Sequence, residues 1–347
     1  MSDRAASRFD LTRAEWEARL ADEPDYRTDQ LWIGLYDHGL EIDAVTTLPA
    51  ALRNRLADEL PNALSPALER HGDGGDTVKW LWDLADGHQI ETVLMHYPDR
   101  STVCISTQAG CAMACGFCAT GQAGFDRNLT VGEIVEQVMR AKRAALPRRL
   151  ANVVFMGMGE PLANYDAVWG AVERVHGDLG LSARNLTIST VGIVPGIDRL
   201  AAESLPVGLA VSLHAANDEL RSELVPINRR YPLPALEAAC ERYRAAKGRR
   251  ITFEWALIDG VNDRPNDAIE LAAMARRLAA HINLIPLNPT AGYSTRGTPP
   301  EGVRRFRQRL RDLGANATVR ENRGTDIEAA CGQLRAAATT SVTAPGR

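Results

Sequence analysis

From about residue 102 onward, apolar runs of strand length alternate with amphipathic stretches of helix length. This alternation indicates successive βα units and a parallel sheet, which places the chain in the α/β class. Right-handed crossovers would curl such a series into a full or partial barrel. We expect six or seven strands, at residues 103–106, 152–156, 186–189, 207–213, 251–257, 282–286 and 317–320. The helices between them are expected to begin near Thr130, Tyr165, Pro195, Pro234, Asn266 and Pro300.

The segments around this barrel carry their own signals. Thr12 to Glu15 has the form of a helical capping box, and residues 71–76 are rich in glycine and aspartate, which is typical of a linker. Two apolar runs flank the turn dipeptide Asp86-Gly87 and predict a β-hairpin. We therefore expect a helical accessory domain with its linker at 1–76, a β-hairpin extension at 77–100, the barrel at 101–335 and a disordered tail at 336–347.

Composition argues against a membrane-bound or secreted protein. The 347 residues are 45% hydrophobic and 24% charged, and they contain neither an apolar run of about 20 residues nor an apolar signal segment. Six cysteines in this length do not suggest a disulfide framework, so we expect a cytoplasmic protein. The formal net charge of -4 argues against a surface that binds nucleic acid indiscriminately. The arginine-rich stretch 304–311 is better explained as the solvated face of a helix.

Three cysteines stand within eight residues, Cys111, Cys115 and Cys118, in the pattern Cys-x3-Cys-x2-Cys. A 4Fe-4S cluster ordinarily takes four thiolates, so a set of three leaves one iron open for another ligand. A structural zinc site would need a fourth ligand, and no Cys-x2-Cys partner pair lies nearby. The spacing resembles the signature of the radical SAM superfamily, in which S-adenosyl-L-methionine (SAM) binds the open iron and is cleaved to a 5'-deoxyadenosyl radical.

The unusual polar clusters of the sequence all follow predicted strands. In barrels of this type the chemistry lies on loops after the carboxyl ends of the strands. Glu160, in Gly157-Met-Gly-Glu-Pro, offers a carboxylate beside glycines that allow close backbone approach. Taken singly, Glu160, His214 and Asn288 are explained as well by a helix N-terminus, a core edge and a turn. Together with the cysteines on one rim, they favour a bound ligand.

The three remaining cysteines differ from one another. Cys240 lies on an amphipathic helical pattern and is interpreted as a buried apolar residue without a role. Cys331 lies just past the last predicted strand, beside Gly332, where it is able to reach the rim. Cys104 lies in the first strand, seven residues before the triad. Two thiols near a radical source suggest a covalent step, although the sequence leaves their separation open.

Ordered segments such as Phe155-Met-Gly-Met-Gly-Glu-Pro-Leu162 and Ala330-Cys-Gly-Gln-Leu334 extend this pattern over nearly the whole chain. With them, the chain resembles the RlmN/Cfr group of radical SAM RNA methyltransferases, and most closely its RlmN branch. The resemblance implies a partial (β/α)6 TIM-like radical SAM barrel and a helical N-terminal domain that helps hold RNA. It also implies methylation at C2 of one adenosine in 23S rRNA, in the peptidyl transferase centre, and of the adenosine beside the anticodon in some tRNAs.

The resemblance also implies roles for single residues. A first SAM methylates Cys331, and a second SAM supplies the radical that removes hydrogen from that methyl group. Two SAM molecules are therefore used per turnover. Cys104 then forms a disulfide with Cys331 and releases the product, while Glu91 is the proton acceptor. The residues that the resemblance assigns to SAM binding are Gly159, Glu160, Ser189, Ser212, Leu213, His214 and Asn288. The implied partners are 23S rRNA, tRNA and a low-potential electron donor of flavodoxin or ferredoxin type, and we expect a monomer.

Several alternatives stay open. Cfr-type methylation at C8 of the same ribosomal adenine would use the same cysteines, although Pro161 looks more like the C2 branch. A radical SAM enzyme with a protein or small-molecule substrate is a second alternative, and a non-catalytic iron-sulfur or RNA-binding protein is a third. Leu287, directly before Asn288, stands where some members of the family have an aromatic residue. This difference does not affect the Asn288 side-chain amide, which the resemblance assigns to SAM binding.

Overall fold

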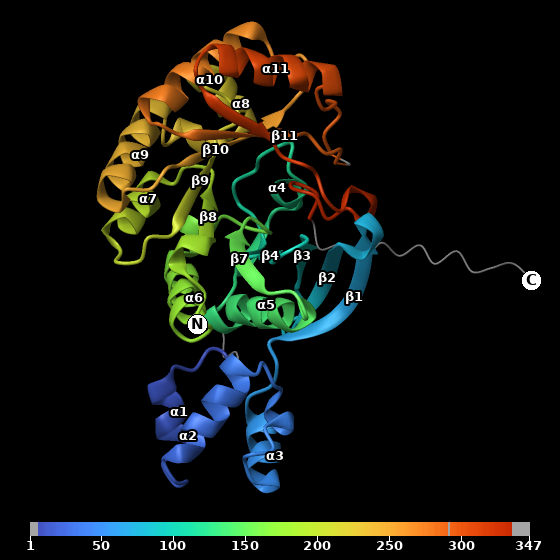
Figure 1. Cartoon of the computed structure of the whole chain (residues 1–347), viewed down its shortest axis with the longest axis vertical. Coiled ribbons are helices and arrows are strands. Elements are labelled where there is room, and N and C mark those ends of the chain that lie inside the picture. The colour runs from blue at the N-terminus through green and yellow to red at the C-terminus, as the bar shows by residue number, and fades with distance from the viewer. Residues whose placement is uncertain (1–5, 291, 335–347) are drawn as a thin grey trace, which may run out of the picture.

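The computed structural model of the chain describes residues 6–290 and 292–334 (Figure 1). A strongly curved sheet carries most helices on its outer face, and a small helical module lies at one end of the molecule. Ten strands form this sheet in the order β1-β2-β3-β4-β7-β8-β9-β10-β11-β12. The tail expected at 336–347 lies outside the described residues.

Seven of these strands form the parallel barrel, and each pairs with the next in chain order. They are β4 (Ser101–Cys104), β7 (Leu150–Phe155), β8 (Leu186–Thr190), β9 (Gly208–Ser212), β10 (Thr252–Leu257), β11 (His281–Pro286) and β12 (Asn316–Val319). Six helical crossovers join the seven strands, so the predicted partial barrel of six βα units is confirmed. The inner strands are short, largely apolar runs because both of their faces are mostly buried, whereas the edge strand β12 has exposed residues at Asn316 and Thr318.

The crossover helices begin within one residue of the predicted positions. They are α5 (Val131–Ala144), α6 (Tyr165–Gly177), α7 (Val194–Ala202), α9 (Leu233–Lys247), α10 (Pro265–Arg277) and α11 (Pro300–Asp312). Thr130 and Glu133 form a capping box that starts α5. The pattern missed the short helix α8 (Asp218–Leu224), which precedes α9 and is capped by the Asn217 side chain. In α11, Val303, Phe306 and Leu310 are buried, as the helical spacing predicts.

The antiparallel extension differs from its prediction. The glycine-rich stretch 71–76 was expected to be a linker, but it ends β1 (Leu64–Gly72), forms the turn η3 (Asp73–Gly75) and leads into β2 (Thr77–Leu84). Gly74 has a φ of 67°, so these glycines serve a tight turn rather than a flexible connection. β2 and β3 (Gln89–His96) form the hairpin, and β3 pairs with β4, so the extension continues the barrel sheet.

The N-terminal module contains α1 (Arg13–Arg19), α2 (Tyr26–Trp32) and α3 (Ala50–Glu59), and Trp16 is buried at its centre. It packs on α5 of the barrel through polar contacts. The Arg143 guanidinium lies 2.6 Å from the Glu41 carboxylate, and the Lys142 ammonium donates to the Tyr36 carbonyl at 2.8 Å. The module is therefore attached to the outer face of the barrel, away from the loops that follow the strands.

Shorter elements complete the described chain. They are η1 (Ile33–Asp37), η2 (Ile42–Ala44), β5 (Gln108–Gly110), α4 (Ala119–Ala123), β6 (Phe125–Asn128), η4 (Pro161–Asn164), η5 (Ala183–Asn185), η6 (Pro226–Arg229) and η7 (Thr325–Ile327). No described helix is long and apolar enough to cross a membrane.

The segment after β12 crosses from the last barrel strand to the antiparallel extension (Figure 1). The Gly324 amide donates to the Asp73 carboxylate at 2.8 Å, and the Arg323 guanidinium donates to the His96 carbonyl at 2.8 Å. These bonds draw the segment across the open side of the barrel. Cys331, near its end, is thereby carried to the rim.

Candidate active site

One cavity lies at the carboxyl ends of the parallel strands. Most of the predicted site residues line it, namely Cys111, Cys115, Cys118, Gly159, Glu160, Ser189, Ser212, His214, Asn288 and Cys331. We call it the cluster cavity. Leu213 does not line it: its side chain is fully buried, and its amide donates to the Glu254 carbonyl at 3.0 Å. Cys104 does not line it either.

The cysteine loop is shaped by its own backbone. The Cys111 amide donates to the Gly124 carbonyl at 2.6 Å, and the Cys118 amide donates to the Cys115 carbonyl at 3.1 Å. A side chain at Gly121 would approach the Cys115 backbone to 3.0 Å, so the loop closes tightly around this glycine. Burial raises the pKa of the Cys111 thiol to about 12 and also raises that of Cys115. Metal binding must therefore drive the deprotonation of these thiols.

The three thiols are arranged to hold a multinuclear cluster. The side chains of Cys111, Cys115 and Cys118 border the same cavity and lie close enough for the charges of Cys111 and Cys118 to act on Cys115. A 4Fe-4S cluster binds each cysteine through a different iron, so its ligands surround a larger group. Three thiolates around a cavity with further polar groups match such a cluster with one open iron.

Glu160 lines the same cavity as the three cysteines. Its carboxylate accepts hydrogen bonds from the Val191 amide at 2.8 Å and the Leu162 amide at 3.0 Å. Burial nevertheless raises the pKa of Glu160 to about 7. Gly159 before it has a φ of 100°, and a side chain there would come within 2.6 Å of Gln108. The glycine is therefore needed to bring this carboxyl group to the cavity wall.

His214 presents a fixed tautomer to the cavity. Its Nδ1 accepts a hydrogen bond from the Ala256 amide at 3.0 Å, so the ring proton is on Nε2. Burial lowers the pKa of His214 to about 3, and the ring is neutral at physiological pH. The ring packs edge-on against Phe117 of the cysteine loop. His214 is thus a neutral hydrogen-bond donor next to the loop that carries the thiols.

Two asparagines hold the backbone at Cys331. The Asn288 amide donates to the Cys331 carbonyl at 3.1 Å, and the Asn322 amide donates to Asn288 Oδ1 at 2.8 Å. The Gly332 carbonyl accepts from the Ala119 amide at 2.7 Å, directly after the cysteine loop. Asn288 therefore positions Cys331 against the cluster cavity, a role that its sequence context did not indicate.

Comparisons with known proteins agree with this geometry. The model of the Radical SAM superfamily matches residues 105–272. The "Probable dual-specificity RNA methyltransferase RlmN" of Parafrankia sp. (strain EAN1pec) is 54% identical over 333 residues, which cover 90% of this chain and 86% of that protein. The protein of the same name from Chloroflexus aurantiacus is 52% identical, with 90% and 87% covered. The chain belongs to the RlmN family. A crystal structure of a radical SAM methyltransferase from Sphaerobacter thermophilus matches with a TM-score of 0.93 at 53% identity, covering 96% of this chain and all of that one.

This RlmN-family chain has a second cavity beside the first, between the barrel and the antiparallel extension. We call it the extension cavity. It is lined by Val93, Met95, Tyr97, Cys104, Met156, Arg320, Glu321, Asn322, Arg323, Ala329, Ala330, Cys331 and Leu334. Cys331, Arg320, Met156 and Leu334 border both cavities, whereas Cys104 borders only the second. Cys331 therefore stands between the cluster cysteines and Cys104.

Arg320, at the end of β12, is a site residue that the sequence analysis missed. Proximity to Cys331 holds the pKa of Arg320 above its ordinary value, although burial acts in the opposite direction. Burial also raises the pKa of the Cys104 thiol to about 12. The one available signal was the position of Arg320 at the carboxyl end of the last strand, where rim residues are expected.

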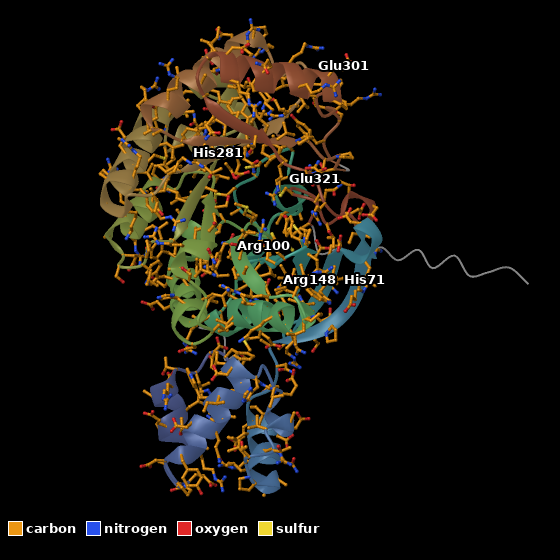
Figure 2. All side chains as sticks on the ribbon, in the orientation of Figure 1. His71, Arg100, Arg148, His281, Glu301 and Glu321 are labelled. Atoms are coloured by element: carbon orange, nitrogen blue, oxygen red, sulfur yellow. The ribbon has the colours of Figure 1, made fainter. Side chains whose placement is uncertain are left out.

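The mouth of the extension cavity carries aromatic and charged groups. Tyr97 contacts two guanidinium groups, that of Arg100 at 4.9 Å and that of Arg323 at 4.4 Å from the ring centroid. Glu321 lies on the segment that follows β12, and Arg100 lies in the turn between β3 and β4 (Figure 2). Tyr97 of the extension and Arg323 of the segment after β12 therefore meet in the wall of this cavity.

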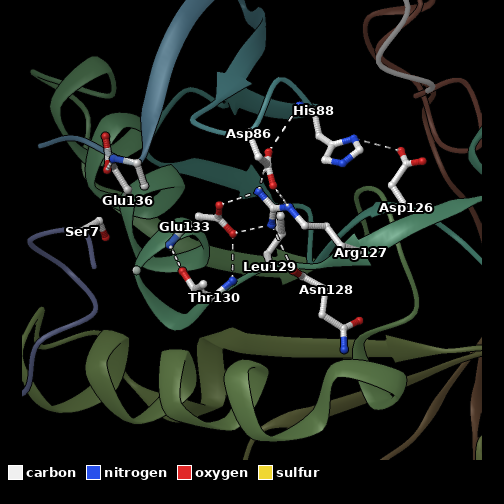
Figure 3. A network of polar contacts seen from close by, with 12 residues as sticks. Ser7, Asp86, His88, Asp126, Arg127, Asn128, Leu129, Thr130, Glu133 and Glu136 are labelled. Atoms are coloured by element: carbon white, nitrogen blue, oxygen red, sulfur yellow. Dashed lines mark hydrogen bonds and ion pairs between the residues drawn. The ribbon is translucent and has the colours of Figure 1, made fainter. Parts of the chain in front are cut away.

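Arg127 connects β6 to the β2–β3 turn and to the start of α5 (Figure 3). Its guanidinium lies 2.5 Å from Asp86 of the β2–β3 turn and 2.8 Å from Glu133 at the start of α5. The neighbouring pair His88 and Asp126 is 3.6 Å apart. Arg127 belongs to β6, which follows the cysteine loop and α4, so these contacts fix β6 relative to the extension.

Proposed function

We propose that this RlmN-family chain methylates C2 of a specific adenosine in 23S rRNA and of the adenosine beside the anticodon in some tRNAs. The observation that carries the proposal is the position of Cys331 between two cavities. One cavity holds the cysteine triad, and the other holds Cys104. A residue in this position is suited to receive a methyl group on one side and deliver it to a base on the other.

The residues of the cluster cavity fit a 4Fe-4S cluster and SAM. Cys111, Cys115 and Cys118 would hold the cluster, and Glu160 and His214 offer an acceptor and a donor for the polar groups of SAM. When bound, these cofactors would supply the one-electron chemistry. This chemistry comprises a 5'-deoxyadenosyl radical, which removes hydrogen from a methyl group on Cys331, and an electron acceptor, which takes up the electron that the ring loses together with the C2 proton. C2 of adenine is an electron-poor carbon and cannot act as a nucleophile, so it cannot take a methyl group from a sulfonium by ordinary polar transfer.

The protein residues then complete the transfer. Glu91 takes the proton from C2 after the carbon attached to Cys331 has bonded to the ring. The Cys104 thiolate attacks the Cys331 sulfur, so that a disulfide forms and the bond between that sulfur and carbon breaks. Its electron pair stays on the carbon, which takes up a proton and becomes the methyl group. Cys104 and Cys331 are both free thiols in the structure and border one cavity, as this step requires.

The direct test is anaerobic reconstitution with iron, sulfide, reductant, SAM and a protein-free 23S RNA fragment, followed by mass spectrometry of the nucleosides. We expect 2-methyladenosine. Finding 8-methyladenosine instead would assign the chain to Cfr-type activity, and deoxyadenosine without a methylated base would contradict the RNA substrate. The Cys331→Ala variant is the control: it should still cleave SAM but form no methylated RNA.

The partners follow from the same proposal. The substrates are 23S rRNA and tRNA in the cytoplasm, and a flavodoxin- or ferredoxin-like protein delivers the electron to a monomeric enzyme. The helical module helps to hold RNA. This last point is supported by family membership rather than by charge, because Arg13 and Arg19 of the module are paired with acidic side chains.

A further inference from the structure

Lys79 is an unusual residue in this chain. Only three of the 40 basic residues are lysines, at positions 79, 142 and 247. Lys79 lies in β2, and its side chain and that of Glu91 are only 8% and 6% exposed. A buried ammonium group requires a paired charge or hydrogen-bond acceptors, because its transfer from water is costly.

Two groups face this ammonium. Its Nζ lies 3.1 Å from Glu91 Oε1 and donates to the Glu328 carbonyl at 3.1 Å. Glu328 precedes Cys331 by three residues and has a positive φ of 54°. Lys79 therefore contacts both the proposed proton acceptor and the backbone of the segment that carries the methylated cysteine.

The sheet register places this pair beside the extension cavity. Lys79 is paired with Val93, and Val93 is paired with Cys104, so the three residues form one row across β2, β3 and β4. Glu91 lies two residues before Val93 and points to the same face of β3. Val93 and Cys104 line the extension cavity, so Glu91 belongs to the face that would meet the base.

We propose that Lys79 is a positioning residue for proton removal from C2 of adenine. Its ammonium binds one oxygen of the Glu91 carboxylate and fixes the orientation of that carboxylate, and its bond to the Glu328 carbonyl keeps the carboxylate in register with Cys331. This inference rests on the proposed function. An arginine presents a planar fork, whereas the compact ammonium can bind one carboxylate oxygen and one carbonyl together, which accounts for a lysine here.

The test compares Lys79→Met, Lys79→Arg and, as a matched control, Lys247→Met. Lys247 also donates to a backbone carbonyl, that of Glu203, but it lies at the end of α9 on the outside of the barrel. Each reconstituted enzyme is given an RNA fragment whose target adenine carries hydrogen or deuterium at C2. Methyl-Cys331, deoxyadenosine and methylated RNA are measured in single turnovers.

For Lys79→Met we expect normal methyl-Cys331 and deoxyadenosine, with RNA product formed about tenfold to a hundredfold more slowly, since a general base contributes about 10²–10⁴-fold. The deuterium isotope effect at C2 should become larger than in wild type, because proton removal becomes the slow step. Lys79→Arg should recover part of the rate, and Lys247→Met should match wild type. In a Glu91→Gln background, Lys79→Met should cause little further loss.

Two results would overturn the inference while leaving the proposed function standing. One is a Lys79→Met enzyme with wild-type rate and isotope effect. The other is a loss of methyl-Cys331 and deoxyadenosine in parallel with the RNA product, which would indicate general damage to the fold. If Lys79→Met does not fold, the Lys79→Arg enzyme must still show a raised isotope effect. Failure of wild type to methylate C2 would instead remove the proposed function itself.

Discussion

The two cavities that meet at Cys331 are built in different ways. The cluster cavity is lined by the carboxyl ends of parallel strands and by the loops that follow them, and its polar groups are fixed by bonds between these neighbouring strands and loops, such as Val191 to Glu160 and Ala256 to His214. The extension cavity is formed where an antiparallel sheet meets the last segment of the barrel. Its contacts join residues far apart in the sequence, for example Arg323 and His96. The proposed cofactor site is thus part of the barrel, whereas the proposed site for the base is assembled around it.

The largest expected effects separate the two cavities by chemistry. Cys115→Ala should abolish cluster assembly and deoxyadenosine formation, because the cluster loses one of its three thiolates. Cys104→Ala should leave SAM cleavage intact and accumulate RNA joined covalently to Cys331, since no thiol is left to release it. Iron content, deoxyadenosine and a denaturing gel for the RNA adduct measure these outcomes. Loss of SAM cleavage in Cys104→Ala would show that the cavities do not act separately.

A large loss of stability is expected when Arg221, which bonds to the loops of the cluster cavity, is replaced. This fully buried guanidinium donates to the carbonyls of Leu213 and Val191 and to Asn228 Oδ1, at 2.6 to 3.1 Å. Arg221→Met should lower the free energy of unfolding by about 3 to 5 kcal/mol, because buried acceptors lose a charged donor.

Urea denaturation of the metal-free protein checks this expectation. The matched control is Arg242→Met, which removes an exposed ion pair with Asp198 and should leave the free energy of unfolding nearly unchanged, because solvent screens the pair. Equal effects of the two substitutions would mean that the loops of the cluster cavity do not depend on their buried network.

A smaller effect concerns the pH dependence of stability in the same cavity. Burial raises the pKa of Glu160 from 4.5 to about 7, so the folded protein keeps a proton that the unfolded chain releases. Stability from this group is therefore complete below about pH 4.5 and declines by about 3 kcal/mol as the pH rises to 7. Glu160→Gln should remove this decline in metal-free protein, as measured by urea denaturation at several pH values. The quantity to compare is the slope of stability against pH rather than the stability at one pH, because the amide of the variant also alters the hydrogen bonds at this position.

The parallel barrel could be predicted from the sequence because its central strands, such as β9 and β10, are buried on both faces and leave largely apolar runs. β1 could not be predicted in this way, because most of its side chains between Leu64 and Gly72 are exposed and no apolar alternation marks it. The turn after β1 was mistaken for a linker for a related reason. Glycine and aspartate are frequent both in linkers and in tight turns, and only the pairing of β1 with β2 shows that this stretch is a turn.

The site shows the same division. The cysteine triad and Glu160 could be proposed from the sequence because their spacing and their place after a strand carry the signal locally. Lys79 and Arg320 could not, since they are noticed only through contacts with other segments; Lys79 contacts a carbonyl 249 residues away. Family resemblance supplied Glu91 and the pairing of Cys104 with Cys331, which no local pattern would have given.

The smallest expected effect lies at the connection between the two regions. Asp86→Asn weakens the ion pair with Arg127, which ties the extension to the segment after the cysteine loop while Arg127 retains Glu133. Because the pair is near the surface, we expect a loss of about 0.5 to 1 kcal/mol that shrinks in high salt. Thermal unfolding at low and high salt measures it. If Asp86→Asn instead reduces cluster content as strongly as Cys115→Ala does, the extension is part of the cofactor site and the distinction between the two cavities fails.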